Sequence, residues 1–300
     1  MGKNVASEAM DFAKLHGLGN DFLILKAGEF AGSQHSLASL AKAICDRHCG
    51  VGADGILFYQ PTSGDTEADF SALIFNADGS RAEMSGNGVR CLAAWLLHSR
   101  QQKLPGIRIR TVAGIKTLML KEQHGLTYHF ECSMGHPILD PVRVPVKLGE
   151  KGRPLLDCPL TFGSEVVRIS VCSLGNPHCT TFWDDLSKTP VESLGPALEQ
   201  HQAFPHRTNV EFVQVLDRHR LRVRFWERGV GPTLASGTGS SAAAVAAILL
   251  GNADSPLTVE TTLGALQVRW AANEELFLSG PAAIVCAGTY YQNTADSAPR

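Results

Sequence analysis

The chain has 300 residues, 44% of them hydrophobic, which is enough apolar material for about two domains that each bury a core. Its 27 basic and 29 acidic residues give a net charge of −2, which argues against nucleic acid or an anionic membrane as a partner. The longest apolar run, residues 242–250, is far shorter than the roughly 20 residues of a membrane span, and the N-terminus lacks the apolar core of a signal peptide, so we expect a cytoplasmic protein.

The first half of the chain predicts strands, then a buried helix, then more strands. β-rich runs cover residues 22–25 and 68–75, with a helical pattern at 36–48 between them. A turn-forming segment then precedes an apolar helix expected over 88–100, and strands resume over 106–120. The eight cysteines follow no disulfide framework, and we expect reduced thiols.

The second half of the chain repeats this order of elements. Strands are expected over 166–172, 209–216 and 221–226, and a helix over 239–251 is so rich in alanine that it should be buried on most sides. Strands over 257–270 follow it.

Three short motifs also occur twice, in the same order and at offsets of about 150 residues, which is too long a period for a solenoid. They are "LGN" from Leu18 and Leu174, "SGNG" and "SGTG" from Ser85 and Ser236, and "TVAG" and "TTLG" from Thr111 and Thr261. The sequence therefore predicts an α+β protein of two similar lobes facing across a cleft, with both buried helices directing their N-termini at that cleft.

Each Ser-Gly-x-Gly motif lies at the predicted start of a buried helix. Serine there is an ordinary N-cap, which needs no function. The glycines weaken a helix start, however, and are useful where the backbone must approach something closely. Free N–H groups at the positive end of a helix form a binding site for an anion such as a carboxylate. Two such sites, one at each motif, predict a small ligand that both of them bind.

Other common motifs are rejected. Cys45, His48 and Cys49 cluster in sequence, but no second pair of ligands at finger-like spacing follows, so no metal site is predicted. Residues 50–55 match G-x-G-x-x-G but follow a helical pattern and precede a strand, the reverse of the dinucleotide fingerprint. Neither Ser85 nor Ser236 lies in the G-x-S-x-G elbow of a serine hydrolase.

Five segments, 14–25, 75–91, 173–178, 207–215 and 226–243, together resemble diaminopimelate epimerase. The resemblance runs from about Met10 to about Tyr290 in the same order as in the family. It implies two pseudo-symmetric lobes, each a β-rich barrel around a central helix, with the active site in the cleft between them. We expect an N-terminal lobe of residues 1–132, completed by a C-terminal strand at about 279–300, and a C-terminal lobe of residues 133–278.

The resemblance also implies a substrate site without metal or any cofactor, pyridoxal phosphate included. Four asparagines would hold the polar groups of the substrate: Asn20, Asn76, Asn176 and Asn209. Glu227 and Arg228 would grip the distal amino acid end. Four backbone N–H groups would bind the reacting carboxylate: those of Gly86, Asn87, Gly237 and Thr238.

The chain departs from the family at its two catalytic positions. The family has cysteines where this chain has Ser85 and Ser236. A thiol with a pKa near 8.5 can supply an anion near neutral pH, whereas a hydroxyl needs a neighbouring base. The candidate bases are His178 and Glu227, which in the family polarise the two thiols. Substrate binding is therefore expected and catalysis is expected to be impaired, whether the serines replaced cysteines in an active enzyme or are a natural variation.

The leading prediction is an isomerase that interconverts LL- and meso-diaminopimelate by two-base proton transfer, in the biosynthesis of lysine and peptidoglycan precursors. One alternative is a non-catalytic homologue that binds an amino acid. Another is a related isomerase of a different amino acid that uses Ser, His and Glu chemistry. The expected partner is a small-molecule substrate, with neither nucleic acid nor a membrane, and a homodimer stays open as the assembly.

Overall fold

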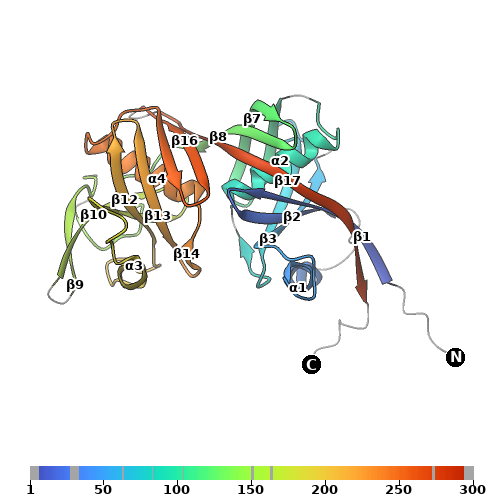
Figure 1. The fold of residues 1–300 in the computed structure, drawn as a ribbon, viewed down its shortest axis with the longest axis horizontal. Coiled ribbons are helices and arrows are strands. Elements are labelled where there is room, and N and C mark those ends of the chain that lie inside the picture. Colours follow the sequence, from blue (N-terminus) through green and yellow to red (C-terminus); the bar gives the residue numbers. More distant parts are fainter. Residues whose placement is uncertain are drawn as a thin grey trace. The chain divides into compact units, whose positions relative to one another are not determined.

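The protein is a strand-rich α+β structure that divides into two compact units (Figure 1). The computed structural model describes residues 7–27, 34–62, 64–82, 84–103, 105–149, 152–162, 165–271 and 274–293. The chain changes unit at Tyr128/His129 and returns to the first unit at Pro281/Ala282, a few residues from the predicted changes at 132/133 and 278/279. None of the described helices is both long and apolar enough to cross a membrane.

The first unit is a barrel of eight strands in the order β8–β17–β1–β2–β3–β4–β6–β7. A tight turn at residues 125–126 leads β7 back into β8 and closes it. The strands are β1 (Ser7–Gly17), β2 (Asn20–Lys26), β3 (Gly55–Pro61), β4 (Phe70–Asn76), β6 (Gly106–Thr111), β7 (Gly114–His124), β8 (Thr127–Gly135) and β17 (Leu276–Asn293), with short β5 (Arg81–Ala82) beside β4.

The second unit repeats this topology. Its strands pair in the order β10–β11–β12–β13–β15–β16–β17, with β9 beside β10 and β14 beside β13. They are β9 (Cys158–Phe162), β10 (Glu165–Ser173), β11 (Pro177–Phe182), β12 (Asn209–Asp217), β13 (Arg220–Glu227), β14 (Gly231–Thr233), β15 (Leu257–Thr261) and β16 (Gly264–Arg269). The parallel pairs also correspond, because β2/β3 and β4/β6 match β11/β12 and β13/β15. The repeat in the sequence is therefore a repeat of the fold, and the prediction of two β-rich barrels is confirmed.

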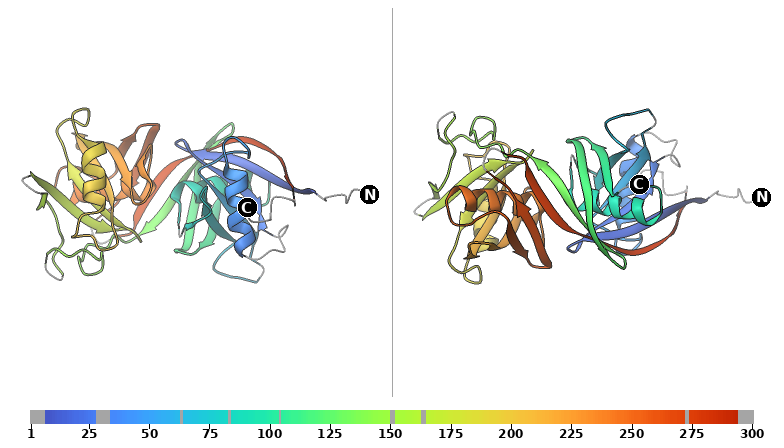
Figure 2. Two further views of the ribbon diagram at one scale, coloured as in Figure 1. Left: turned by 90° about the horizontal axis from the view of Figure 1, so that it is seen from below. Right: turned by 90° about the horizontal axis from the view of Figure 1, so that it is seen from above.

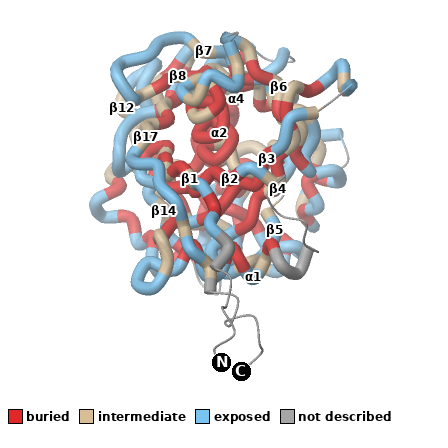
Figure 3. The backbone as a smooth tube through the Cα atoms, turned by 90° about the vertical axis from the view of Figure 1, so that its right-hand side faces the viewer, coloured by how far each residue is buried: buried red, intermediate tan, exposed pale blue. Residues whose placement is uncertain are grey.

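One buried helix lies in each unit, α2 (Gly86–His98) in the first and α4 (Gly237–Leu249) in the second. Figure 3 shows both largely in the colour of buried residues. Helix α4 contacts β10, β11, β12, β13, β15 and β16, so no face of it is left for solvent over most of its length. Small alanine side chains let strands pack close to it on every side, which confirms the expectation from its composition.

The other two helices, α1 (Gln34–Cys45) and α3 (Val191–Glu199), lie on the outside of the strands of their own units (Figure 2, left). The sequence predicted α1 but not α3, since α3 follows Pro190 and contains Gly195 and Pro196, which are poor helix formers. Tertiary packing overrides that propensity. A Cβ at Gly195 would lie 2.5 Å from Cδ2 of Trp226, so only glycine lets this ring pack against the helix.

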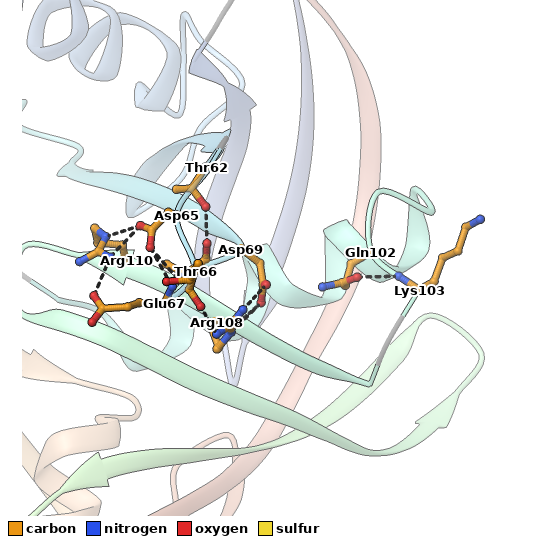
Figure 4. Close-up of polar contacts among 10 residues, drawn as sticks. Thr62, Asp65, Thr66, Glu67, Asp69, Gln102, Lys103, Arg108 and Arg110 are labelled. Carbon is orange, nitrogen blue, oxygen red and sulfur yellow. Dashed lines mark hydrogen bonds and ion pairs between the residues drawn. The ribbon is translucent and has the colours of Figure 1, made fainter.

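Ion pairs fix the segment before β4 to strand β6 (Figure 4). The Arg108 guanidinium binds the Asp69 carboxylate at 2.9 Å, and Arg110 binds Asp65 at 2.7 Å. Solvent screens these partly exposed pairs, so they add little to stability, and their role is to set the path of this segment.

We predict that Ala244→Leu destabilises the second unit by about 1–3 kcal/mol, because Ala244 is fully buried and extra methyl groups overpack a barrel interior. Urea unfolding measures the change. Ala265→Leu, at an exposed position of β16, is the matched control and should stay within about 0.5 kcal/mol of the parent. Equal stability of Ala244→Leu and the parent would contradict the close packing described for α4.

Candidate active site

Ser85 and Ser236 begin the two buried helices in the same geometry. Their backbone dihedral angles are φ −138°, ψ 116° and φ −135°, ψ 126°. Each hydroxyl accepts a hydrogen bond from the N–H three residues on, that of Gly88 at 3.1 Å and that of Gly239 at 3.2 Å. The N-cap interpretation is therefore confirmed for both serines.

Within the described part of the chain, the caps leave two backbone N–H groups at each helix start without an acceptor. The first four N–H groups of a helix have no acceptor within the helix. Here the hydroxyl of the capping serine accepts a hydrogen bond from the third N–H, and the carbonyl of the same serine accepts one from the fourth. Among the described residues, no protein group accepts from the remaining ones, which belong to Gly86, Asn87, Gly237 and Thr238. Together with the positive end of the helix dipole they can receive an anion.

The second glycine of each motif is required by packing. A Cβ at Gly88 would lie 3.0 Å from Cδ1 of Leu57, and one at Gly239 would lie 2.9 Å from Cδ1 of Phe225. The expectation that these glycines permit a close approach is correct at both positions. Packing does not require a glycine at position 86, because a Cβ at Gly86 would lie 3.7 Å from the nearest heavy atom.

In the first unit, hydrogen bonds join three of the polar groups near Ser85. The amide of Asn87 donates to the side-chain oxygen of Asn20 at 3.2 Å, and the amide of Asn20 donates to Asp54 at 2.9 Å. Asn87 also accepts from the fully buried Arg90. Asn76 is different, because its side chain donates to Ser80 at 2.9 Å within its own turn.

A cluster of charges below Asn20 was not foreseen. Arg47 binds Asp21 at 2.8 Å and Asp54 at 2.7 Å, and Lys14 binds Asp21 at 3.1 Å. Burial works toward a higher pKa for Asp21, but the hydrogen bonds from Arg47 and Lys14 outweigh it and lower that pKa to about 2. Arg47 belongs to the Cys-rich segment considered for a metal, and its role is to hold the loop that carries Asp54.

In the second unit, His178 lies between two polar side chains. Its Nδ1 is 2.6 Å from Oε1 of Glu211, and its Nε2 is 2.9 Å from Oδ1 of Asn176. His178 and Glu211 are both buried. Glu211 was also not foreseen, although it is the single charge in the apolar run of residues 209–213, which is a signal that sequence reasoning could use.

The amide of Asn209 joins two segments of the second unit. It donates to the carbonyl of Pro177 at 3.0 Å and accepts from the backbone N–H of Arg228 at 3.0 Å. Its two side-chain polar atoms therefore hold backbone in place. The guanidinium of Arg228 is exposed, and among the residues that the structure describes it donates only to the carbonyl of His206, at 3.3 Å, so it can receive an anionic group.

A second buried carboxylate, Glu199 of α3, supports the turn after Arg228. It accepts from the indole of Trp226 and from the backbone N–H of Gly229, each at 2.9 Å, and lies 3.5 Å from Arg207. It connects the segment before Asn209 with the segment that carries Arg228.

Glu227 lies beside the Ser236 hydroxyl. Burial raises the pKa of Glu227, and the hydrogen bond with Ser236 and the nearby His178 act in the opposite direction. A carboxylate with a raised pKa that touches a hydroxyl can take a proton from it more readily than an exposed carboxylate can.

We predict that Glu227→Gln stabilises the fold increasingly as pH rises. A carboxyl whose folded pKa is raised favours folding below its ordinary value of 4.5, and this contribution is lost as pH rises through the raised pKa. The amide cannot ionise, so the difference in Tm should be small near about pH 4 and grow toward about pH 8. The exposed Glu274→Gln is the control, and a difference in Tm for Glu227→Gln that is flat or shrinks with pH would refute the burial of the charge.

Comparison with known proteins agrees with this arrangement. The family model for diaminopimelate epimerase matches residues 12–139 and 170–285. A diaminopimelate epimerase of Pelotomaculum thermopropionicum is 42% identical over 285 residues, which cover 95% of this chain and all of that protein. A diaminopimelate epimerase of Synechococcus elongatus is 42% identical over 281 residues, 94% of this chain and 98% of that one.

Solved structures share the fold at low sequence identity. A hydroxyproline epimerase of Agrobacterium vitis has a TM-score of 0.69 at 16% identity, covering 97% of this chain and 94% of that one. A probable proline racemase of Agrobacterium radiobacter has a TM-score of 0.65 at 13% identity, covering 93% and 92%. With a family model that matches most of its residues and relatives of this similarity along nearly its whole length, the chain belongs to the diaminopimelate epimerase family.

Proposed function

We propose that the protein binds diaminopimelate and is built to interconvert its LL and meso forms, as an isomerase of lysine and peptidoglycan precursor biosynthesis. The observation that carries this is the pair of matching helix starts, each with two free N–H groups and a capping serine. The relatives named above, which are diaminopimelate epimerases, support the choice of substrate.

The free N–H groups of the two helices would bind the α-carboxylate of one substrate. Inversion at an α-carbon passes through a carbanion, and its negative charge spreads onto that carboxylate. Fixed N–H dipoles at two helix ends stabilise this charge without reorganisation, so the chemistry as proposed needs neither a metal nor pyridoxal phosphate. Asn20, Asn176 and the exposed guanidinium of Arg228 would bind the other polar groups.

The two serines would serve opposite faces of the α-carbon. One group removes the proton while the opposite group returns one, which inverts the centre. A hydroxyl is a poor proton acceptor near neutral pH, and each serine here already accepts a hydrogen bond from its own helix. Glu227, in contact with Ser236, and His178 are the bases that could assist.

The two serines also favour a second candidate, a homologue that binds the amino acid without turning it over. The N-cap geometry and the free N–H groups would be the same in both cases. Proton exchange at the α-carbon, and not binding, separates the two functions.

We predict that Arg228→Ala leaves the fold intact and weakens diaminopimelate binding by about 2–5 kcal/mol, or about 30-fold to a few thousand-fold in Kd. The reason is that a charged substrate group would lose its guanidinium partner. Calorimetry measures the affinity. Arg224→Ala, on the strand that ends just before Arg228 but paired with Glu192, is the control, and equal affinities for both variants would remove Arg228 from the site.

We predict that the unmodified chain binds diaminopimelate but exchanges its α-proton slowly or not at all. A positioned acid or base contributes about 10²–10⁴-fold, so weakening both could cost up to roughly 10⁴–10⁸-fold, and less if the pair acts as a unit. Ser85→Cys should restore exchange on one face, and Ser85→Cys with Ser236→Cys should restore both exchange and inversion. The measurements are α-proton exchange in D₂O and LL-to-meso conversion.

Two outcomes would change the conclusion. Turnover of the unmodified chain at about 1–10³ per second would show that serine suffices. A double variant that binds but remains inert would favour the binding homologue.

A further inference from the structure

Glu211 stands behind His178 in the interior of the second unit. Strands β11 and β12 run parallel with Thr180 opposite Glu211, so the carboxylate reaches back along the sheet to the ring. Its Oε1 lies 2.6 Å from Nδ1 of His178, and its Oε2 accepts from the Thr180 hydroxyl at 3.3 Å. A Cβ at Gly239 would lie 3.1 Å from Oε1, so the first turn of α4 closes over the carboxylate.

Among the residues that the structure describes, His178 is the one side chain in contact with Glu211 that can carry a positive charge. Glu211 is 1% exposed and the His178 side chain is not exposed at all. An ionised carboxylate at such a place is costly unless it accepts strong hydrogen bonds. A ring N–H at 2.6 Å is a charge-assisted donor of this kind.

We propose that Glu211 is a positioning residue that keeps a proton on Nδ1 of His178, so that Nε2 is the ring nitrogen that takes up and returns a proton. Nε2 faces Asn176, on the side predicted to receive the substrate. The assignment holds for both states of the ring. In the imidazolium Nε2–H donates to Oδ1 of Asn176 as that amide lies here, and in the neutral ring the lone pair of Nε2 requires the amide to turn its NH2 group toward it. The pair of His178 and Glu211 then supplies a base at the proposed site, and to that extent the inference rests on the proposed function.

The groups around this pair are few. Cys172 of β10 and Cys179 of β11 are buried thiols whose pKa values are raised by burial, so both stay neutral. Glu227 of β13 is the other carboxyl nearby, and the first turn of α4 has no acidic residue. Burial also raises the pKa of Glu211, and the His178 ring and the Thr180 hydroxyl oppose this.

The first experiment needs neither substrate nor turnover. Nitrogen-15 spectra of the histidine rings, with His178 assigned by the peak lost in His178→Gln, report which ring nitrogen is protonated. In the unmodified chain, from about pH 6 to about pH 8, Nδ1 should be protonated at every point. An unprotonated Nδ1 with the proton on Nε2 would overturn the inference without any variant.

The matched variants are Glu211→Gln and Thr180→Val. In Glu211→Gln the Thr180 hydroxyl, a donor to Oε2 in the unmodified chain, favours the amide oxygen on its own side, so that the NH2 group faces Nδ1 and should move the ring proton to Nε2. Thr180→Val removes only the partner of Oε2 and should leave Nδ1 protonated. A protonated Nδ1 in Glu211→Gln would refute the inference. If Glu211→Gln does not fold, the spectrum of the unmodified chain still decides it.

Activity separates this inference from the proposed function. With Ser85→Cys and Ser236→Cys as the active background, adding Glu211→Gln should lower kcat by about 10²-fold or more, the lower end for a positioned base, with little change in KM. An inert background variant would refute the function and leave the spectral result standing. Full kcat with Glu211→Gln in an active background would refute Glu211 alone.

Discussion

Both halves of the proposed site depend on a helix packed inside a barrel of strands. In the second unit the strands pack close to α4 because alanines face them, whereas in the first unit larger buried side chains of α2, such as Leu92 and Leu96, fill the barrel interior. Gly88 and Gly239 carry the same restriction into the first turn, where side chains of the strands leave no room for a Cβ. A helix held this tightly has a fixed N-terminus, so its free N–H groups point in one direction. A preorganised binding site for a negative charge needs donors with such a fixed direction.

The two units have the same topology but opposite electrostatics. In the first unit, Asp21 is ion-paired with Arg47 and Lys14, and its pKa is lowered. In the second, the carboxyls of Glu211 and Glu227 are buried beside a histidine and a hydroxyl, and their pKa values are raised. A duplicated fold has thus been given two different proton environments.

Local features of the sequence were sufficient to predict the repeat, the buried helices and both serine caps. Each depends on neighbouring residues, such as a serine before glycine or a run of alanines at helical spacing. The partners of the polar groups were not predictable in the same way. Glu211 meets His178, and Glu199 meets Trp226, only after strands far apart in the chain have paired. Helix α3 was missed for a related reason, since the sequence does not show that its glycine is required by packing against the ring of Trp226.

Strand β17 has a consequence for how the protein is made. Its first residues pair with β16 in the second unit, and from Ala283 onward it pairs with β1 in the first. The barrel of the first unit therefore stays one strand short until the ribosome has also produced all of the second unit, although domains generally fold as they emerge. During that interval one edge of β1 is unpaired, because the strand that will pair with it lies more than two hundred residues further along the chain. An exposed strand edge of this kind can pair with the wrong strand or with another chain. The unit that is synthesised first is thus the one that is completed last.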